Sequence, residues 1–406
     1  MSQTKAQLVS GTTAQDLTVD NINTTSINSG QASGRKNIII NGAMNVAQRG
    51  TSATSTGHQT VDRMNFGGSW PGSAITQSQS DVASETTPYT LGFRKAYKIV
   101  NSNQSSAGAA YYIVMTYKTE SQDLATSGWN YKSASSYITV SFWVKSSVAQ
   151  NFYVRFQTKD GGSTYNYPFE TGSLTADTWT KVTHSIPGNS NLTIDNDNGE
   201  GPKIQWAMYR GSNDTSSSVT LNQWAAYSDG TKTPDYTAAM DDWFLTNGAT
   251  FEITGLQLEV GSTATDFEHR SIAEELALCQ RYYIEYDADL FQDTIVFSGL
   301  SRAGTAKFFT FQLPASMRTD PTITRTGNIR MVNLDDKQQV DGPSDGLAIG
   351  GVTPTTQLIG TPTGSGDKIS FYYNGSISGM NDTGNCGYMM MFVSEVGSQL
   401  TFSAEL

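Results

Sequence analysis

The stretch Ile138-Thr139-Val140-Ser141-Phe142-Trp143-Val144-Lys145 alternates apolar and polar side chains with a period of two residues. A β-strand directs successive side chains to opposite faces, so this period is typical of a strand with one buried face. We expect the apolar positions from Ile138 to Val144 in the core, and Thr139, Ser141 and Trp143 on the opposite face.

Runs with the same alternation recur on both sides of this stretch, at 111–117, 152–156 and 204–208. The turn-forming clusters between the runs are rich in Gly, Asn, Asp and Pro and lie at 159–162, 187–189 and 196–199. Many short strands joined by such turns favour an antiparallel sandwich or jelly roll. We therefore predict an all-β fold with a jelly-roll domain at 36–270, in which no helical period of useful length interrupts the strand pattern from about residue 37 to 260.

One helix is predicted after this domain. Ser271 and Glu274 have the spacing of a capping box, in which both side chains bond backbone N–H groups at the helix start. The apolar positions that follow at helical spacing are Ile272, Leu276, Cys279 and Tyr283. A connecting helix is thus expected at 271–283, followed by a smaller C-terminal β-sandwich domain at 284–406.

Residues 1–35 are polar, with isolated aliphatic side chains among Ser, Thr, Asn and Gly. Such a segment cannot bury enough surface to order itself alone. It is either a disordered tail or an extended segment that pairs with another chain during assembly.

Charged residues make up only 16% of the 406 residues, against about 25% in typical soluble proteins, and the formal net charge is −11. This balance disfavours a nucleic-acid partner, because phosphate contacts need clustered Lys and Arg. No apolar run is long enough to span a membrane, and the first eleven residues lack the pattern of a signal peptide. We expect synthesis in the cytoplasm, no membrane insertion and two free thiols, Cys279 and Cys386.

No motif predicts an enzyme, a metal site or a cofactor. The three histidines, His58, His184 and His269, have no second ligand at metal-binding spacing. Residues 195–200 resemble the start of a calcium loop, but Trp206 stands where an EF-hand needs Glu. An Asn/Gly turn or a structural calcium site are the remaining interpretations of this segment. Carboxylates are plentiful, but the sequence cannot place a pair across a cleft.

Aromatic and amide side chains on the faces opposite the apolar sets suit sugar recognition, because a ring stacks on a pyranose while amides and Arg bind its hydroxyls. The alternative is that these rings pack under loops or against a neighbouring subunit. The candidate glycan-binding residues are Trp143, Tyr153, Arg155 and Tyr209, taken as one face, with Tyr372 and Tyr388 in the C-terminal domain.

Several segments together resemble a β-rich region of bacteriophage tail fibre proteins. They are 37–44, 48–50, 61–63, 254–261, 267–270, 274–283 and 313–322, with Met64 where the family usually has Trp. The resemblance implies a jelly roll like that of carbohydrate-binding modules and a virion appendage that is usually a homotrimer. On this resemblance we predict that residues 1–35 serve trimerisation and attachment to the virion, and that domain 284–406 is the distal, receptor-binding tip. It transfers no binding residue, because these motifs look structural.

Three functions follow as hypotheses. The first is a tail fibre that attaches the virion to host surface glycan (lipopolysaccharide or capsule) without cleaving it, held to the tail, baseplate or an adaptor protein through residues 1–35. Three-fold repetition would turn weak single-site binding into avidity. The second is a tailspike enzyme that degrades polysaccharide, and the third is a purely structural baseplate or capsid appendage.

Overall fold

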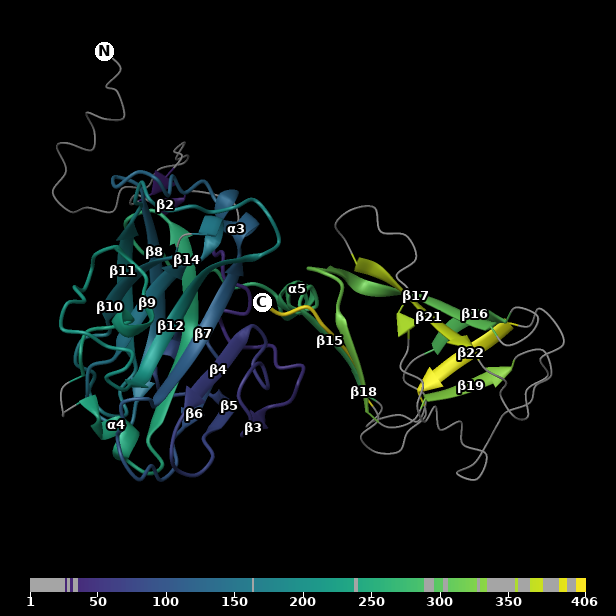
Figure 1. Ribbon diagram of the computed structural model, residues 1–406, viewed down its shortest axis with the longest axis horizontal. Helices are drawn as coiled ribbons and strands as arrows, with labels where there is room; N and C mark the ends of the chain where they lie inside the picture. The colour runs from purple at the N-terminus through teal and green to yellow at the C-terminus, as the bar shows by residue number, and fades with distance from the viewer. Residues whose placement is uncertain are drawn as a thin grey trace, which may run out of the picture.

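The computed structural model describes residues 36–160, 162, 164–236, 240–286, 313–324 and 399–406 with their side chains, and further strands by their backbone. Two antiparallel six-stranded sheets form a sandwich in the first two-thirds of the chain (Figure 1). A short helix, α5 (Ile272–Cys279), and a three-stranded sheet lie beside the sandwich, and another six-stranded sheet lies beyond them. The predicted all-β, antiparallel fold class is confirmed.

We name the two sheets of the sandwich after their central strands. The β9/β12 sheet contains, in spatial order, β13 (Ala225–Ala226), β10 (Tyr165–Glu170), β9 (Tyr153–Thr158), β12 (Glu200–Arg210), β7 (Tyr112–Glu120) and β4 (Met64–Ser69). The β8/β14 sheet contains β11 (Thr180–Pro187), β8 (Tyr137–Ser146), β14 (Thr250–Val260), β6 (Lys95–Val100), β5 (Thr76–Asp81) and β3 (Ser52–Ala53). All strand pairs in both sheets are antiparallel.

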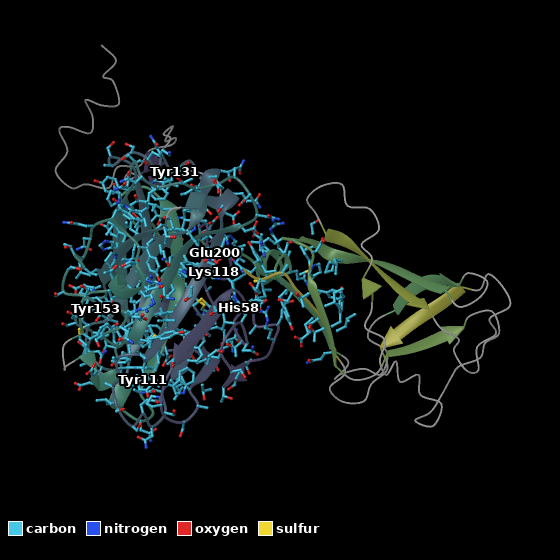
Figure 2. All side chains as sticks on the ribbon, viewed as in Figure 1. His58, Tyr111, Lys118, Tyr131, Tyr153 and Glu200 are labelled. Atoms are coloured by element: carbon cyan, nitrogen blue, oxygen red, sulfur yellow. The ribbon has the colours of Figure 1, made fainter. Side chains whose placement is uncertain are left out.

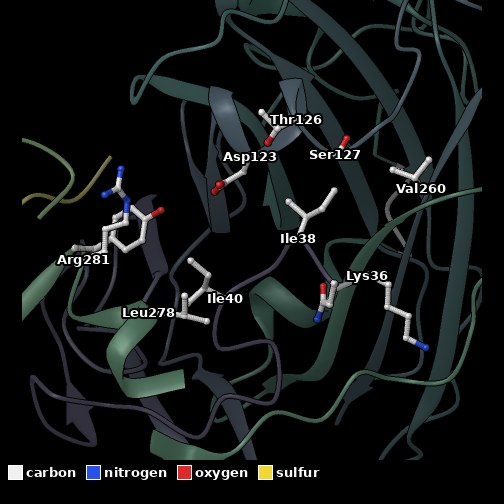
Figure 3. Close-up of a pocket in the computed structure, with 11 residues that line it drawn as sticks. Lys36, Ile38, Ile40, Asp123, Thr126, Ser127, Val260, Leu278 and Arg281 are labelled. Carbon is white, nitrogen blue, oxygen red and sulfur yellow. The ribbon is translucent and has the colours of Figure 1, made fainter. Parts of the chain in front are cut away.

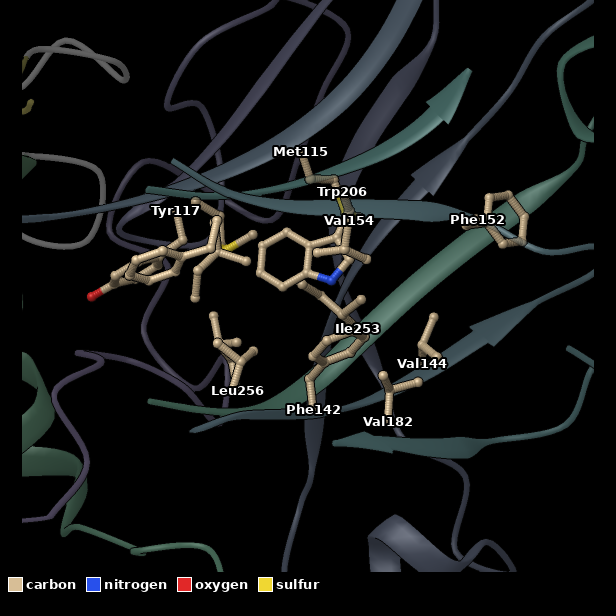
Figure 4. Close-up of a cluster of buried hydrophobic side chains, with 14 of the residues drawn as sticks. Met115, Tyr117, Phe142, Val144, Phe152, Val154, Val182, Trp206, Ile253 and Leu256 are labelled. Atoms are coloured by element: carbon tan, nitrogen blue, oxygen red, sulfur yellow. The ribbon is translucent and has the colours of Figure 1, made fainter. Parts of the chain in front are cut away.

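The core lies between these sheets, where the alternation predicted it (Figure 4). Phe142 of β8 and Trp206 of β12 are fully buried, and their rings meet edge to face with centroids 5.4 Å apart. The apolar positions from Ile138 to Val144 are likewise 0% exposed. Burying a side chain of this size contributes about 1.5–3 kcal/mol, so these rows supply much of the stability of the sandwich.

Short one-turn helices lie between the strands before residue 260. Three one-turn helices lie in this region, namely α2 (Thr87–Thr90), α3 (Ser121–Ala125) and α4 (Asp242–Leu245), with the 3₁₀ turns η1 (Asp160–Gly162) and η2 (Asp229–Thr231). Each is too short to show a helical period in the sequence. They close loops, as α4 does by burying Trp243 and Phe244 under the end of the sandwich.

Helix α5 (Ile272–Cys279) begins where the capping box predicted, with the Ser271 hydroxyl accepting the Glu274 N–H. It ends earlier than the predicted residue 283, because Tyr283 already pairs with Ser403 in a sheet. That three-stranded sheet consists of β15 (Tyr283–Asp287), β23 (Gln399–Ser403) and β18 (Thr322–Thr326).

The last residues of the chain return to the sandwich. After β23, the Ala404 N–H donates to the Tyr282 carbonyl at 2.8 Å, and Lys118 Nζ donates to the Leu406 carbonyl at 2.9 Å. The C-terminus therefore lies beside α5 (Figure 1).

The remaining strands form the distal sheet and one small hairpin. The distal sheet contains, in order, β19 (Ile329–Asn333), β22 (Gly387–Phe392), β16 (Val296–Ser301), β17 (Ala306–Met317), β21 (Gly366–Asn374) and β20 (Thr355–Thr356). The hairpin pairs β1 (Ser26–Ile27) with β2 (Gly30–Gln31), and the rest of segment 1–35 lies outside the described residues.

Candidate functional site

The segments that resemble tail fibres converge beside α5. The Asn37 side chain accepts N–H groups of Ile39 and Leu258 at 3.0 and 3.1 Å, which joins the start of the domain to β14. Arg270 donates to the Ile39 carbonyl and to Glu275, and the Asn41 N–H donates to Glu275 in turn. These side chains hold chain segments to one another, which gives the motifs a structural role.

A buried ion cluster continues this junction toward the C-terminus. The Arg63 guanidinium, 1% exposed, lies 2.5 Å from the Glu405 carboxylate and 3.4 Å from the ring centroid of Tyr282. Arg49 lies 3.1 Å from the other oxygen of Glu405. We call Arg49, Arg63, Arg270, Glu275 and Glu405 the motif hub. Each of its arginines forms an ion pair with a carboxylate of the chain.

The electrostatics of the hub follow from this pairing. Although burial opposes ionisation, the charges of Arg63, His58 and Arg49 lower the pKa of Glu405 to about 2. Burial lowers the pKa of His58 to about 4 and raises that of Asp62 to about 6. Glu405 is therefore ionised at neutral pH, and His58 beside it is neutral.

One cavity, of about 260 Å³, lies next to the hub (Figure 3). Its lining includes Ile38 and Leu278 as well as the charged Arg281. Arg281 Nε and Nη2 donate to the two carboxylate oxygens of Glu120 at 2.6 and 2.8 Å. A bidentate pair of this kind satisfies the guanidinium within the chain, so this cavity offers a ligand little recognition.

The outer face of the β9/β12 sheet is different. Cross-strand pairing places Arg155 of β9 beside Gln205 of β12, and Gln205 beside Thr116 of β7. The pleat directs these three side chains away from the core, since the alternate positions Val154 and Trp206 are fully buried. A polar row thus crosses the middle of the sheet.

A second cavity, of about 370 Å³, opens over this row. The loop between β12 and α4 covers the face around it, with the Tyr236 hydroxyl donating to the Ala207 carbonyl at 3.1 Å. The residues that line this second cavity are Ala110, Tyr112, Arg155, Gln205, Arg210, Asn213, Asp214, Tyr227 and Lys232. We call this space the sheet cavity.

Two guanidinium groups meet at one amide in the sheet cavity. Gln205 Oε1 accepts from Arg155 Nε at 2.9 Å and also from Arg210 Nη2, while Gln205 Nε2 donates to the Thr116 hydroxyl at 2.8 Å. Arg155 and Arg210 are only 4% and 3% exposed. Arg155 Nη1 and Arg210 Nε are buried without a hydrogen-bond partner among the described residues. Buried donors of this kind are rare because each costs free energy.

Positive charge accumulates around this pair. Burial and then the charge of Arg210 lower the pKa of Arg155 to about 9. Burial and then the charge of Arg155 lower the pKa of Lys203, two residues before Gln205 on β12, to about 8. Both groups still carry a proton at pH 7, and burial is the main cause of both shifts, with a neighbouring cation as the second.

The structure separates the residues predicted as one glycan-binding face. Trp143 lies on the β8/β14 sheet, where it packs against a small cluster that contains Phe93, so it does not share a face with the other three. The error arises because alternation tells inside from outside but not which sheet a strand joins. Tyr372 and Tyr388 lie in β21 and β22, and their side chains lie outside the described residues.

Tyr153 lies on the predicted face but is covered, whereas Tyr209 follows a register shift in β12, pairs with the buried Ile113 and belongs to the core. Tyr236 packs edge-on against both rings, and Phe244 stacks on Tyr209 with centroids 4.1 Å apart. This arrangement matches the alternative that the rings pack under loops. In Figure 2, Tyr153 lies toward the edge of the sandwich away from α5, whereas Lys118 and Glu200, paired at 2.9 Å, lie toward α5.

Of the predicted residues, Arg155 alone lines the sheet cavity. Sequence reasoning missed Arg210, Asp214, Tyr227 and Lys232. The last three lie in the loop between β12 and α4, whose sequence has no period that indicates where it folds. Arg210 has the parity of the buried positions Trp206 and Met208, and it reaches the outer face only because the register of β12 shifts between Ala207 and Tyr209. Alternation in the sequence could therefore not identify it.

Within the described residues, no group of three or more His, Cys, Asp or Glu side chains is placed to hold a metal ion. In the calcium-like segment, Asp197 Oδ1 accepts the Gly199 N–H at 2.9 Å, as in an Asn/Gly-type turn. In the part of the chain that the structure describes, the helices are all too short or too polar to cross a membrane.

Comparison with known proteins gives only distant similarity. No family model and no curated protein sequence matches the chain. Among solved structures, an enzymatically active domain of tailspike protein 4 from bacteriophage CBA120 is 8% identical, with a TM-score of 0.31 over 55% of this chain and 21% of that one.

Two sugar-binding structures are similarly remote. A putative sugar-binding protein from Bacteroides thetaiotaomicron is 13% identical, with a TM-score of 0.28 over 55% of this chain and 99% of that one. A family 11 carbohydrate-binding module from Clostridium thermocellum, in complex with a mixed-linked tetrasaccharide, is 11% identical, with a TM-score of 0.23 over 54% and 98%. These scores are too low to support an argument about function, and no family is established for the chain.

Proposed function

We propose that this protein attaches a virion to its host by binding surface glycan, without cleaving it, through the sheet cavity. The observation that carries the proposal is the buried Arg155–Gln205–Arg210 cluster, which lines an open cavity and keeps donors that the described chain does not use. Sugars present many hydroxyl groups, which suit such donors. Tyr112 and Tyr227 add aromatic surface to the same lining.

Binding is favoured over hydrolysis by the lining of the sheet cavity. Most glycosidases use two carboxyl groups on either side of the scissile bond. The lining contains a single carboxylate, Asp214, which pairs with both Arg210 and Lys232 at 2.7 Å. We assign the virion location, the homotrimer and the attachment through residues 1–35 on the sequence resemblance to tail fibres.

Binding of the labelled full-length protein to an array of bacterial lipopolysaccharides and capsular polysaccharides tests the proposal. We expect binding to at least one polysaccharide and no release of new reducing ends. Tyr227→Ala removes a ring at the cavity and is expected to weaken binding about tenfold, within the range for loss of a stacked aromatic contact.

The matched control is Tyr137→Ala, on the β8/β14 sheet, which is expected to leave binding unchanged. An equal loss of glycan affinity in both variants would show that the glycan binds outside the sheet cavity. New reducing ends would favour the tailspike hypothesis, and absence of binding to every polysaccharide would favour a purely structural appendage.

A further inference from the structure

We propose that the sheet cavity selects acidic glycans, with a sugar carboxylate bound between Arg155 and Arg210. This inference rests on the proposed function and names the chemical class of its ligand. It follows from three properties of the cavity: its charge balance, the geometry of its donors and the acceptors around it.

The charge balance of the sheet cavity is positive. Its lining has three cationic side chains, Arg155, Arg210 and Lys232, against the one carboxylate of Asp214. Arg155 forms no ion pair with a carboxylate of the described residues, and its polar partners are neutral groups, the amide of Gln205 and the hydroxyl of Tyr227. A buried charge without a counter-ion is costly, so an anion that enters the cavity removes an existing penalty.

The donor geometry suits a carboxylate. Two guanidinium groups converge on the single oxygen Gln205 Oε1, and each keeps a buried nitrogen without a partner. Guanidinium groups present planar sets of N–H donors that match the two oxygens of a carboxylate. The chain as a whole carries a net charge of −11 and would repel an acidic polymer, so local positive charge is needed for such a ligand to bind.

The acceptors indicate that the anion belongs to a sugar. Gln157 Oε1 and Asn166 Oδ1 are buried without partners among the described atoms. The two residues pair across β9 and β10, beside the polar row and outside the lining of the cavity. Thr233 Oγ1, also without a partner among the described atoms, follows the cavity residue Lys232. Acceptors need donors, which a bare carboxylate lacks and sugar hydroxyls provide. A carboxylated sugar supplies both from one residue.

The test is an array of bacterial polysaccharides, each printed in its native form and after chemical reduction of its carboxyl groups to alcohols. We expect the full-length protein to bind carboxylated polysaccharides and to lose about tenfold or more in affinity for their reduced forms, in line with loss of charged hydrogen bonds. Equal binding to both forms, or a preference for phosphorylated polysaccharides without carboxylates, would overturn the inference and leave the proposed function intact. Binding to none would overturn both.

Two variants test whether the selectivity for carboxylated polysaccharides arises in the sheet cavity. Arg155→Gln is expected to weaken binding to the native polysaccharide about tenfold and to leave the weak binding of its reduced form nearly unchanged. The control is Arg94→Gln, since Arg94 is exposed and donates to the carbonyls of Tyr89 and Phe93 away from the cavity. Lys232→Gln, in the cavity-lining loop, is expected to shift selectivity in the same direction by a smaller factor and serves if Arg155→Gln fails to fold. Unchanged selectivity in both cavity variants would contradict the inference.

Discussion

The motif hub and the sheet cavity both bury arginine, but they balance its charge differently. In the hub, Arg63 lies against Glu405, and Arg270 lies against Glu275. In the sheet cavity, Arg155 lies against Gln205 and beside a second guanidinium. The hub joins segments that are far apart in the chain, and each of its arginines pairs with a carboxylate of the same chain. The cavity leaves positive charge available, as a ligand site requires.

The largest effect is expected from breaking the hub. Arg63→Gln leaves the buried Glu405 carboxylate without its nearest cation and is expected to lower the free energy of unfolding by about 4 kcal/mol, as loss of one partner of a buried ion pair does. Chemical denaturation followed by tryptophan fluorescence measures this change. A loss below about 1 kcal/mol, the value for a surface pair, would show that the hub is not a structural centre.

The next largest effect is expected in the pH dependence of stability, through Glu405 of the hub. The folded-state pKa of Glu405, about 2, lies below its ordinary value of 4.5, so its stabilisation is fully present above pH 4.5 and is lost as the pH falls toward 2. At neutral pH the shift corresponds to about 3 kcal/mol.

Melting temperatures of the wild type and Glu405→Gln, measured from pH 7 to pH 2, check this sign. Asp62, whose folded-state pKa is raised to about 6, titrates in the opposite sense and is present in both proteins. The difference between the two curves is expected to shrink below pH 4.5. A constant difference over this range would contradict the assignment of Glu405 as the ionised partner of Arg63.

The same substitution in the sheet cavity is expected to have a small effect on stability. Arg155→Gln removes a desolvated charge that has no carboxylate partner, so the free energy of unfolding is expected to change by less than about 1 kcal/mol, or to rise. The denaturation assay used for Arg63→Gln measures it. A loss as large as that of Arg63→Gln would make Arg155 a structural residue and remove the contrast between the two regions.

The smallest effect on binding is expected at the opposite sheet. Trp143→Phe changes a ring that packs near Phe93 on the β8/β14 sheet, far from the cavity lining. Glycan affinity is expected to stay within about twofold of the wild type, because surface changes away from a site contribute little. A tenfold loss in the array assay would restore Trp143 to the binding site and displace the sheet cavity.

These regions differ in how far the sequence predicts them. The alternation from Ile138 to Val144 predicts a strand and its buried face, because the period of two is a local property. The spacing of Ser271 and Glu274 predicts where α5 begins, but not where it ends. The end depends on Tyr283 pairing with Ser403, 120 residues later, and no local pattern records such a contact.

The binding residues show the same limit. Arg155 was recognisable because it stands on the outward face of a strand. Trp143 was grouped with it wrongly, since a strand pattern does not name the sheet that the strand joins. Lys232 reaches the cavity through the folding of a long loop, and the Arg63–Glu405 pair depends on the return of the C-terminus. These are tertiary contacts. The sequence has no periodic pattern or motif at these positions, so it does not predict the contacts.

The most direct test of the central claim is a crystal structure of the full-length protein with an acidic oligosaccharide released from the polysaccharide that it binds best. We expect the sugar in the sheet cavity, with a carboxylate oxygen within hydrogen-bond distance of Arg155 or Arg210. A sugar bound beside Trp143 on the β8/β14 sheet, or on the distal sheet with the sheet cavity left empty, would contradict the claim.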